Sequence, residues 1–318
     1  MPPPEKRPVA TVLTIAVLAI VAAVVAGAVY ERVERSQDLR RFPQIGRSYD
    51  VGGRRLNLFC SGEGTPAVIL ESPPPMPGYA WTFVQHEIAK FTLACWYDRA
   101  GYGWSDPGPN PRDPAAIAHD LHTLLRAAEI RPQYVIVGAT FGALYARVYN
   151  RLYPGETAGM VLVDPVGANE TTDPKSKGPV PQFLHWPQSL LAQGLNQVGL
   201  VRLLGSGTRA AGPGATPEGL TEQEWSIVRG LRNEPKNRTA LLQELVADFA
   251  AEERAAGNLE NIPLIVLTSR AADVNSDKLS TQEKSIVVAN GRNAIQFNAP
   301  HAVIDAVREI VAGLRRIR

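Results

Sequence analysis

The sequence is poor in the side chains that build metal and redox centres. Its 318 residues include two cysteines and five histidines, and their spacing matches no zinc-binding pattern. The formal net charge is only +2, which gives no field strong enough to indicate a nucleic acid as a partner. No internal repeat of solenoid or propeller length is present. We therefore expect no metal, no cofactor and no nucleic-acid partner.

What the sequence does contain is one long apolar segment without a charge, from Val9 to Tyr30. About 20 such residues span a bilayer, whereas the apolar part of a secretory signal usually has about 7–15. Small residues at 26–28 resemble a cleavage site, so removal of the segment is the alternative. We expect a basic segment over residues 1–8, a single-pass transmembrane helix over 9–30 that anchors the protein in a membrane, and a charged stalk over 31–44.

The orientation of the anchor depends on two opposing signals. More basic residues follow the apolar segment than precede it, and such a bias favours a cytoplasmic domain. Long domains are nevertheless translocated largely regardless of their charge. The only cysteines, Cys60 and Cys95, fall on strands that we expect to be neighbours. A disulfide between them would suit an exported domain, and two buried thiols are an equally economical interpretation. We take an extracytoplasmic domain as the expectation.

Short apolar runs alternate with helical segments along the rest of the chain. Gly52 and Gly53 stand between two runs and predict a hairpin with a two-residue turn. Alternating strands and helices imply a mostly parallel sheet with helices on both faces. We expect eight strands, the second antiparallel, at residues 46–51, 54–60, 67–71, 92–97, 134–137, 160–163, 264–267 and 285–288, with helices that include 114–128 and 302–314.

A long interval over residues 167–261 interrupts this alternation. It opens with chain rich in Pro, Gly and Ser, continues through amphipathic stretches at 188–204 and 239–255, and has a flexible break at 210–217. An insertion after the sixth strand is where a helical lid belongs in such a sheet. The predicted division is therefore an α/β core over residues 45–166 and 262–318, with a helical lid over 167–261.

Several runs together resemble one family. These runs cover residues 50–64, 97–108, 121–125 and 159–164. They are similar to segments of a bacterial, membrane-anchored branch of the α/β-hydrolase fold family. The resemblance extends from about Phe42 to the C-terminus and is weak across the lid. It implies the α/β-hydrolase fold and the hydrolysis of esters or related acyl substrates, although a fold alone does not establish a function.

The family's nucleophile lies in a G-x-S-x-G turn between a strand and a helix. This chain has Gly138-Ala139-Thr140-Phe141-Gly142 in its place, so that Thr140 occupies the position of the serine. The two glycines are retained where strand and helix approach closely. A residue at this turn usually has a positive φ, which strains a β-branched side chain. The resemblance implies that Thr140 is the nucleophile position, with a hindered hydroxyl.

The histidine and the acid of the expected triad are also altered. The family's histidine lies in a segment similar to S-G-H-x-I-Q, and this chain places Asn293 there. An amide cannot accept the proton of a hydroxyl near neutral pH. His185 in the lid and His301 at the start of the last helix are the candidates for a base that has moved. The acid is expected at Asp273 or Asp164, each of which is equally suited to cap a helix or form a turn.

The turn that should form the oxyanion hole departs from the family as well. It follows Glu71, and Pro73 and Pro74 occupy its donor region. Proline has no N–H to donate, which leaves the N–H of Phe141 as the other donor. Losing one donor typically lowers a rate by roughly 10²–10³. Farther along the chain, Asp98 and Arg99 are expected to form a structural pair near the fourth strand.

Together these departures remove the base, an accessible nucleophile and part of the oxyanion hole. They favour a pseudohydrolase with a structural, protein-contact or ligand-binding role. Its partner would be a membrane protein or a small apolar ligand under the lid. The alternative is an active hydrolase that uses Thr140 as an atypical nucleophile with a base from the lid or elsewhere.

Overall fold

An eight-stranded sheet forms the centre of the computed structural model, which describes residues 7–166, 216–245, 247–269, 278–289 and 294–317. The strand order is β1-β2-β4-β3-β5-β6-β7-β8, and β2 is antiparallel to both of its neighbours while the other pairs are parallel. This confirms the expected sheet. The strands are β1 (Arg47–Asp50), β2 (Arg55–Ser61), β3 (Ala67–Glu71), β4 (Ala94–Tyr97), β5 (Tyr134–Ala139), β6 (Thr157–Val163), β7 (Leu264–Thr268) and β8 (Glu283–Val287).

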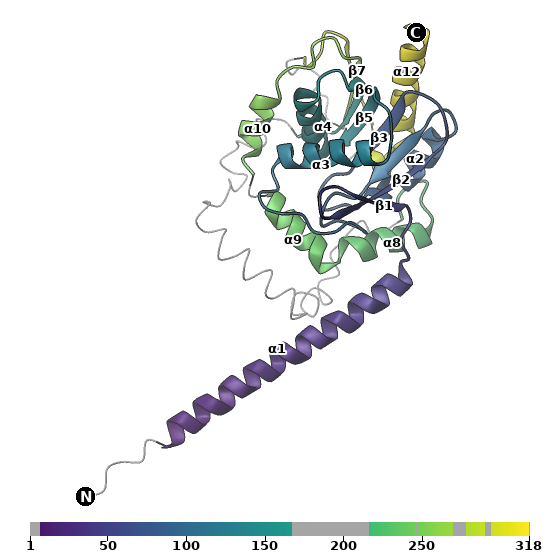
Figure 1. Cartoon of the computed structure of the whole chain (residues 1–318). Helices are drawn as coiled ribbons and strands as arrows, with labels where there is room; N and C mark the ends of the chain where they lie inside the picture. Colours follow the sequence, from purple (N-terminus) through teal and green to yellow (C-terminus); the bar gives the residue numbers. More distant parts are fainter. Residues whose placement is uncertain (1–6, 167–215, 246, 270–277, 290–293, 318) are drawn as a thin grey trace, which may run out of the picture.

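Helices cover both faces of the sheet (Figure 1). One apolar core packs α2 and α12 against it, and a second packs α3 and α4 against the opposite face. Because both faces are covered, β3, β5 and β6 are apolar along most of their length, as buried parallel strands usually are. The helices are α1 (Arg7–Arg41), η1 (Gly78–Trp81), α2 (Thr82–Ile88), α3 (Pro114–Ala127), α4 (Phe141–Leu152), α8 (Glu222–Arg232), α9 (Pro235–Glu244), α10 (Phe249–Ala256), α11 (Ile295–Asn298) and α12 (Pro300–Ile317).

The hairpin between β1 and β2 has the expected two-residue turn. Gly52 and Gly53 have φ values of 96° and 82°, and the N–H of Val51 donates to the carbonyl of Arg54 at 2.9 Å. Positive φ at both central residues is typical of a type I′ turn. The Asp50 carboxylate accepts the N–H of both glycines at 2.8 Å, which fixes the turn further.

A disulfide joins β2 to β4. Cys60 and Cys95 are opposite each other in the antiparallel register and are bonded to one another. Cys95 is fully buried, and Cys60 is half-buried. Of the two interpretations that the sequence left open, the structure has the disulfide.

The N-terminal helix α1 is 35 residues long and projects away from the body (Figure 1). Its segment Thr11–Tyr30 is long and apolar enough to cross a membrane, and none of that segment is buried. The helix ends at the body, where Phe42 is buried. The Phe42 ring lies against Gly230 of α8, at which a Cβ would come within 2.3 Å of the ring. The Trp104 indole N–H also donates to the Phe42 carbonyl at 3.1 Å.

The described part of the predicted lid is helical. α8 begins with a capping box, in which the side chains of Thr221 and Glu224 each bond the backbone of the other residue. The amphipathic stretch at 239–255 forms parts of two helices, because Asp248 caps a separate helix α10 by accepting the N–H of Ala251 at 3.0 Å. The predicted stretch at 188–204 lies outside the described residues, and the division of the chain at 167 and 261 stays a prediction.

Candidate active site

Thr140 lies at a sharp turn between β5 and α4, at the carboxyl edge of the sheet. Its φ is 48° and its ψ is −114°, and its N–H donates to the Val163 carbonyl at 2.9 Å. A Cβ on Gly138 would lie 2.4 Å from the Gly142 carbonyl oxygen, and a Cβ on Gly142 would lie 2.8 Å from that of Glu71. The strand and helix therefore need both glycines. The turn has the geometry of a nucleophile elbow, with the strain expected for a β-branched residue.

Asp164 lies at the same edge, directly after β6. Its N–H donates to the Leu267 carbonyl at 2.7 Å. Its carboxylate accepts the N–H of Ser269 at 3.0 Å and the Ser269 hydroxyl at 2.9 Å. Ser269 follows β7, so the carboxylate joins the ends of two neighbouring strands. The other predicted triad positions, Asp273 and Asn293, lie outside the described residues.

Three described histidines, His119, His122 and His301, have partners other than Thr140. His119 and His122 contact residues at the far end of α4: the His119 Nδ1 is 2.9 Å from the Tyr153 hydroxyl, and the His122 ring stacks on Tyr153 with centroids 3.9 Å apart. His301 is exposed and lies edge-on to the ring of Phe83. No described histidine is a hydrogen-bond partner of Thr140, and the described residues hold no group of three metal-ligating side chains. The predicted alternative base His185 lies outside the described residues.

The loop after β3 has few N–H groups to offer a substrate oxygen. Pro73 and Pro74 have none, and the N–H of Met76 donates to the Pro73 carbonyl at 2.7 Å. Phe141 is the first residue of α4, and its ring packs on Phe249 of α10 with centroids 4.7 Å apart. The Phe141 N–H is thus at the positive end of a helix beside Thr140, where N–H groups favour a negative charge.

A buried ion-pair network holds the start of the loop after β3. The Arg99 guanidinium donates to Glu71 at 2.7 Å and to Glu244 at 3.1 Å, and it also donates to the Ser72 carbonyl. The three charged side chains are at most 2% exposed. Burial by itself lowers the pKa of Arg99, but the carboxylates of Glu244 and Glu71 outweigh burial and hold this pKa well above its usual value. The network joins helix α9, which lies in the predicted lid, to the end of β3.

Three tyrosines complete the network. The Tyr97 hydroxyl donates to Glu71, and the hydroxyls of Tyr102 and Tyr145 donate to Glu244 at 2.9 and 3.4 Å. Burial raises the pKa of Glu71, and it raises the pKa values of the tyrosines well above their usual range. The carboxylates therefore have donors on several sides, as buried charges require. Sequence reasoning missed this network.

Asp98 and Arg99 were expected to form a structural pair. Both have structural contacts, but each bonds other residues. The Asp98 carboxylate accepts the N–H of Gly78 at 2.7 Å and that of Trp104 at 3.0 Å, together with the side-chain amide of Asn57 at 3.0 Å. Burial raises the pKa of Asp98. The residue thus fixes the end of the loop after β3, while Arg99 fixes its beginning.

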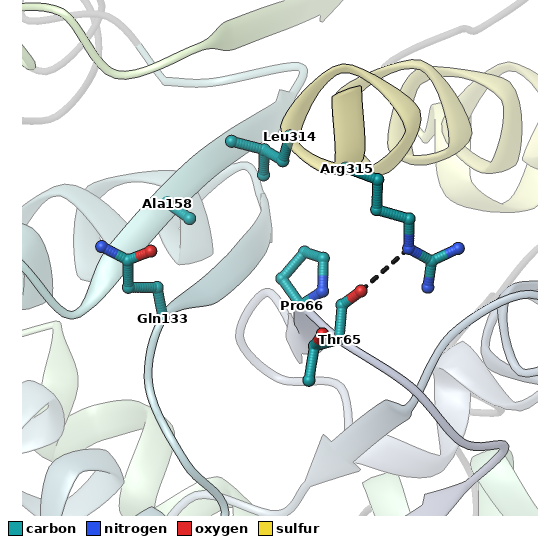
Figure 2. A pocket seen from close by; sticks show the side chains of 6 residues that line it. All are labelled: Thr65, Pro66, Gln133, Ala158, Leu314 and Arg315. Atoms are coloured by element: carbon teal, nitrogen blue, oxygen red, sulfur yellow. Dashed lines mark hydrogen bonds between the residues drawn. The ribbon is translucent and has the colours of Figure 1, made fainter. Parts of the chain in front are cut away.

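A hollow at the opposite edge of the sheet is separate from these residues. Its inner part has a volume of about 100 Å³ and is shown in Figure 2, where Arg315 donates to the Thr65 carbonyl at 2.9 Å. It adjoins a more open hollow of about 600 Å³ that shares Gln133, Ala158 and Leu314 with it. Ligands of open α/β sheets bind outside the carboxyl ends of the strands. The candidate active site is therefore the edge at Thr140.

Comparisons with known proteins agree with this arrangement. A candidate epoxide hydrolase from Pseudomonas aeruginosa superimposes with a TM-score of 0.66 at 18% identity, over 85% of this chain and 96% of that one. An esterase from Thermogutta terrifontis superimposes with a TM-score of 0.58 at 17% identity, over 85% and 99% of the two chains.

A 2-hydroxymuconate semialdehyde hydrolase from Pseudomonas sp. (strain CF600) is 31% identical over 134 residues, which are 40% of this chain and 46% of the relative. The chain spans less than half the length of the curated relatives it matches, and no family model matches it. The elbow at Thr140, the strand order and these neighbours agree, and the chain has the α/β-hydrolase fold.

Proposed function

We propose that the protein is a membrane-anchored pseudohydrolase that holds a ligand or a partner at the Thr140 edge without hydrolysing it. The observation that carries this proposal is the state of Asp164. Its carboxylate accepts the N–H and the hydroxyl of Ser269, and no described histidine forms a hydrogen bond with Thr140. A threonine hydroxyl is a weak nucleophile unless a base removes its proton. In this proposal Asp164 serves as a structural link between the ends of β6 and β7 and takes no part in a proton relay.

The loop after β3 supports the same proposal. Pro73 and Pro74 cannot donate, and the N–H of Met76 is used within the loop. The missing donor alone would lower a rate by roughly 10²–10³. Because the buried Arg99 network and Asp98 hold this loop from both ends, it has little freedom to rearrange and present another N–H.

The proposed location is a membrane, with the globular domain on the extracytoplasmic side. Helix α1 supplies the anchor through residues 9–30, and the Cys60–Cys95 disulfide is of the kind that persists in oxidising compartments. A role in such a place is contact with a membrane protein or binding of a small apolar ligand under the lid. The bacterial origin implied by the resemblance is part of this proposal.

The alternative is an active hydrolase with Thr140 as nucleophile. Two observations favour it: the strained elbow is retained, and similar proteins are named as hydrolases. Strained backbone often persists where it has a function. A base from outside the described residues, such as His185, would be needed.

Turnover of activated esters distinguishes the two. The full chain is purified in detergent, and its rate is compared with that of Thr140→Ala, which removes the hydroxyl and keeps the Cβ. We expect equal rates, because none of the residues that the structure describes supplies a base at the elbow. A parent rate well above that of Thr140→Ala would reject the pseudohydrolase and establish the alternative.

A further inference from the structure

Helix α9 has one face in the core and another in solvent. Asn237, Ala240 and Glu244 are buried. Leu242 and Leu245 are 43% and 45% exposed. Together with Arg238 they follow the i, i+4, i+7 spacing that places side chains on one face of a helix. Two large apolar side chains and a cation therefore share the outer face of α9.

The charges of α8 and α9 leave two arginines without an acidic partner in the part of the chain that the structure describes. These are Arg232 and Arg238, both half-buried. Burial, and after it the neighbouring Arg238 guanidinium, lower the pKa of Arg232. The acids of both helices have other partners, in the pairs Glu222–Arg229, Glu224–Thr221, Glu234–Lys236 and Glu244–Arg99. Two adjacent guanidinium groups in this state favour an anion.

The anchor helix ends beside α8, the helix that carries Arg232. In the view of Figure 1, α1 runs obliquely below α9 and ends at α8, where Phe42 contacts Gly230. The part of α1 beyond Tyr30 adds roughly 16 Å of helix. A headgroup layer is about 5–8 Å thick, and transmembrane helices commonly tilt by about 20°. At this tilt the stalk rises about 15 Å, so its end lies about 7–10 Å beyond the headgroups, and α9, which in the view of Figure 1 lies back along the stalk from that end, is nearer to them.

We propose that Arg232, Arg238, Leu242 and Leu245, here called the α9 surface, contact the anionic headgroups of the membrane that α1 spans. The arginines bind lipid phosphates, and the leucines enter the layer beneath them. This rests on the proposed membrane anchor. Because Glu244 of α9 bonds Arg99, which holds the loop beside Thr140, the membrane contact is joined to the candidate site.

A matched pair of tryptophan probes tests the contact. Leu242→Trp places a probe on the α9 surface, and Leu152→Trp places one on a residue that is 41% exposed at the far end of α4. The full chain is reconstituted in vesicles of phosphatidylcholine brominated near the glycerol, with or without about 30% phosphatidylglycerol. The quenching of each probe is obtained by subtracting the quenching of the native tryptophans in the parent chain. Leu245→Trp serves as a second probe if Leu242→Trp does not fold.

In anionic vesicles we expect the Leu242→Trp probe to be quenched at least about twice as strongly as the Leu152→Trp probe. Adding Arg232→Gln and Arg238→Gln should lower the quenching of the Leu242→Trp probe to that of the Leu152→Trp probe. Omitting the anionic lipid should have the same effect. Equal quenching of both probes in a chain that floats with the vesicles after a carbonate wash would reject the α9 surface and keep the anchor. Extraction by carbonate would reject the anchor and the surface with it.

Discussion

Replacing Thr140 by glycine should stabilise the protein. Its φ of 48° and ψ of −114° are close to the first central position of a type II′ turn, which glycine dominates. A non-glycine residue in such a region is strained by about 1–3 kcal/mol. Glycine in turn gives the unfolded chain more freedom, which costs about 0.4–1 kcal/mol. The net expectation for Thr140→Gly is a gain of about 1 kcal/mol in the free energy of unfolding.

The comparison with alanine isolates the backbone effect. Thr140→Ala keeps the Cβ and therefore the strain, so the glycine variant should exceed it by about 1–2 kcal/mol. At Thr123, in the middle of α3, the order should reverse, with alanine about 1 kcal/mol more stable than glycine. Urea unfolding of the four full-length variants in detergent, followed by circular dichroism, measures both differences. A Thr140→Gly chain less stable than Thr140→Ala would refute the reasoning.

The remaining predictions concern packing and buried charge. Gly230→Ala should destabilise the protein by about 1–3 kcal/mol, because the added methyl meets the Phe42 ring. Gly313→Ala, whose methyl meets nothing within 4 Å, should stabilise the protein by up to about 1 kcal/mol. Thermal unfolding of both variants tests these opposite signs. Glu244→Gln should cost about 1–3 kcal/mol and speed hydrogen exchange in the loop after β3 more than in β5, and equal changes in both would contradict the link. Burial raises the pKa of Asp98 above 3.8, so the folded state retains a proton that the unfolded chain releases. The contribution of Asp98 to stability should therefore fall as the pH rises above about 4, and urea titrations should show a flatter pH dependence in Asp98→Asn.

Most of the fold could be predicted from local patterns. The apolar runs gave the strands to within a few residues, since buried parallel strands leave long uninterrupted apolar stretches. The paired glycines predicted the turn before β2. Helix α8 was missed although Thr221 and Glu224 have the spacing of a capping box, and the break before α10 was missed although Asp248 is a good cap. Both signals are short and become visible only when helix ends are sought.

The candidate site was predictable only where its residues lie close in sequence. Thr140 and its glycines form one turn, so the motif by itself predicts the geometry of the elbow. Arg99 and Glu244 are 145 positions apart, and no local pattern brings a lid carboxylate to the end of β4. Asp164 was named as an acid, but its bond to Ser269 depends on the pairing of β6 with β7. The assignments of Asn293 and Asp273 stay predictions.

Fluorophosphonate labelling of the intact full-length chain tests the central claim most directly, because the reagent forms a covalent adduct only with an activated hydroxyl. Mass spectrometry should find no adduct on the parent chain or on Thr140→Ser, because the substitution adds no base and no described histidine bonds residue 140. The double variant Thr140→Ser/Asn293→His should gain a slow adduct at residue 140, limited by the missing oxyanion donor. An adduct on Thr140 in the parent chain would contradict the account and establish an active hydrolase.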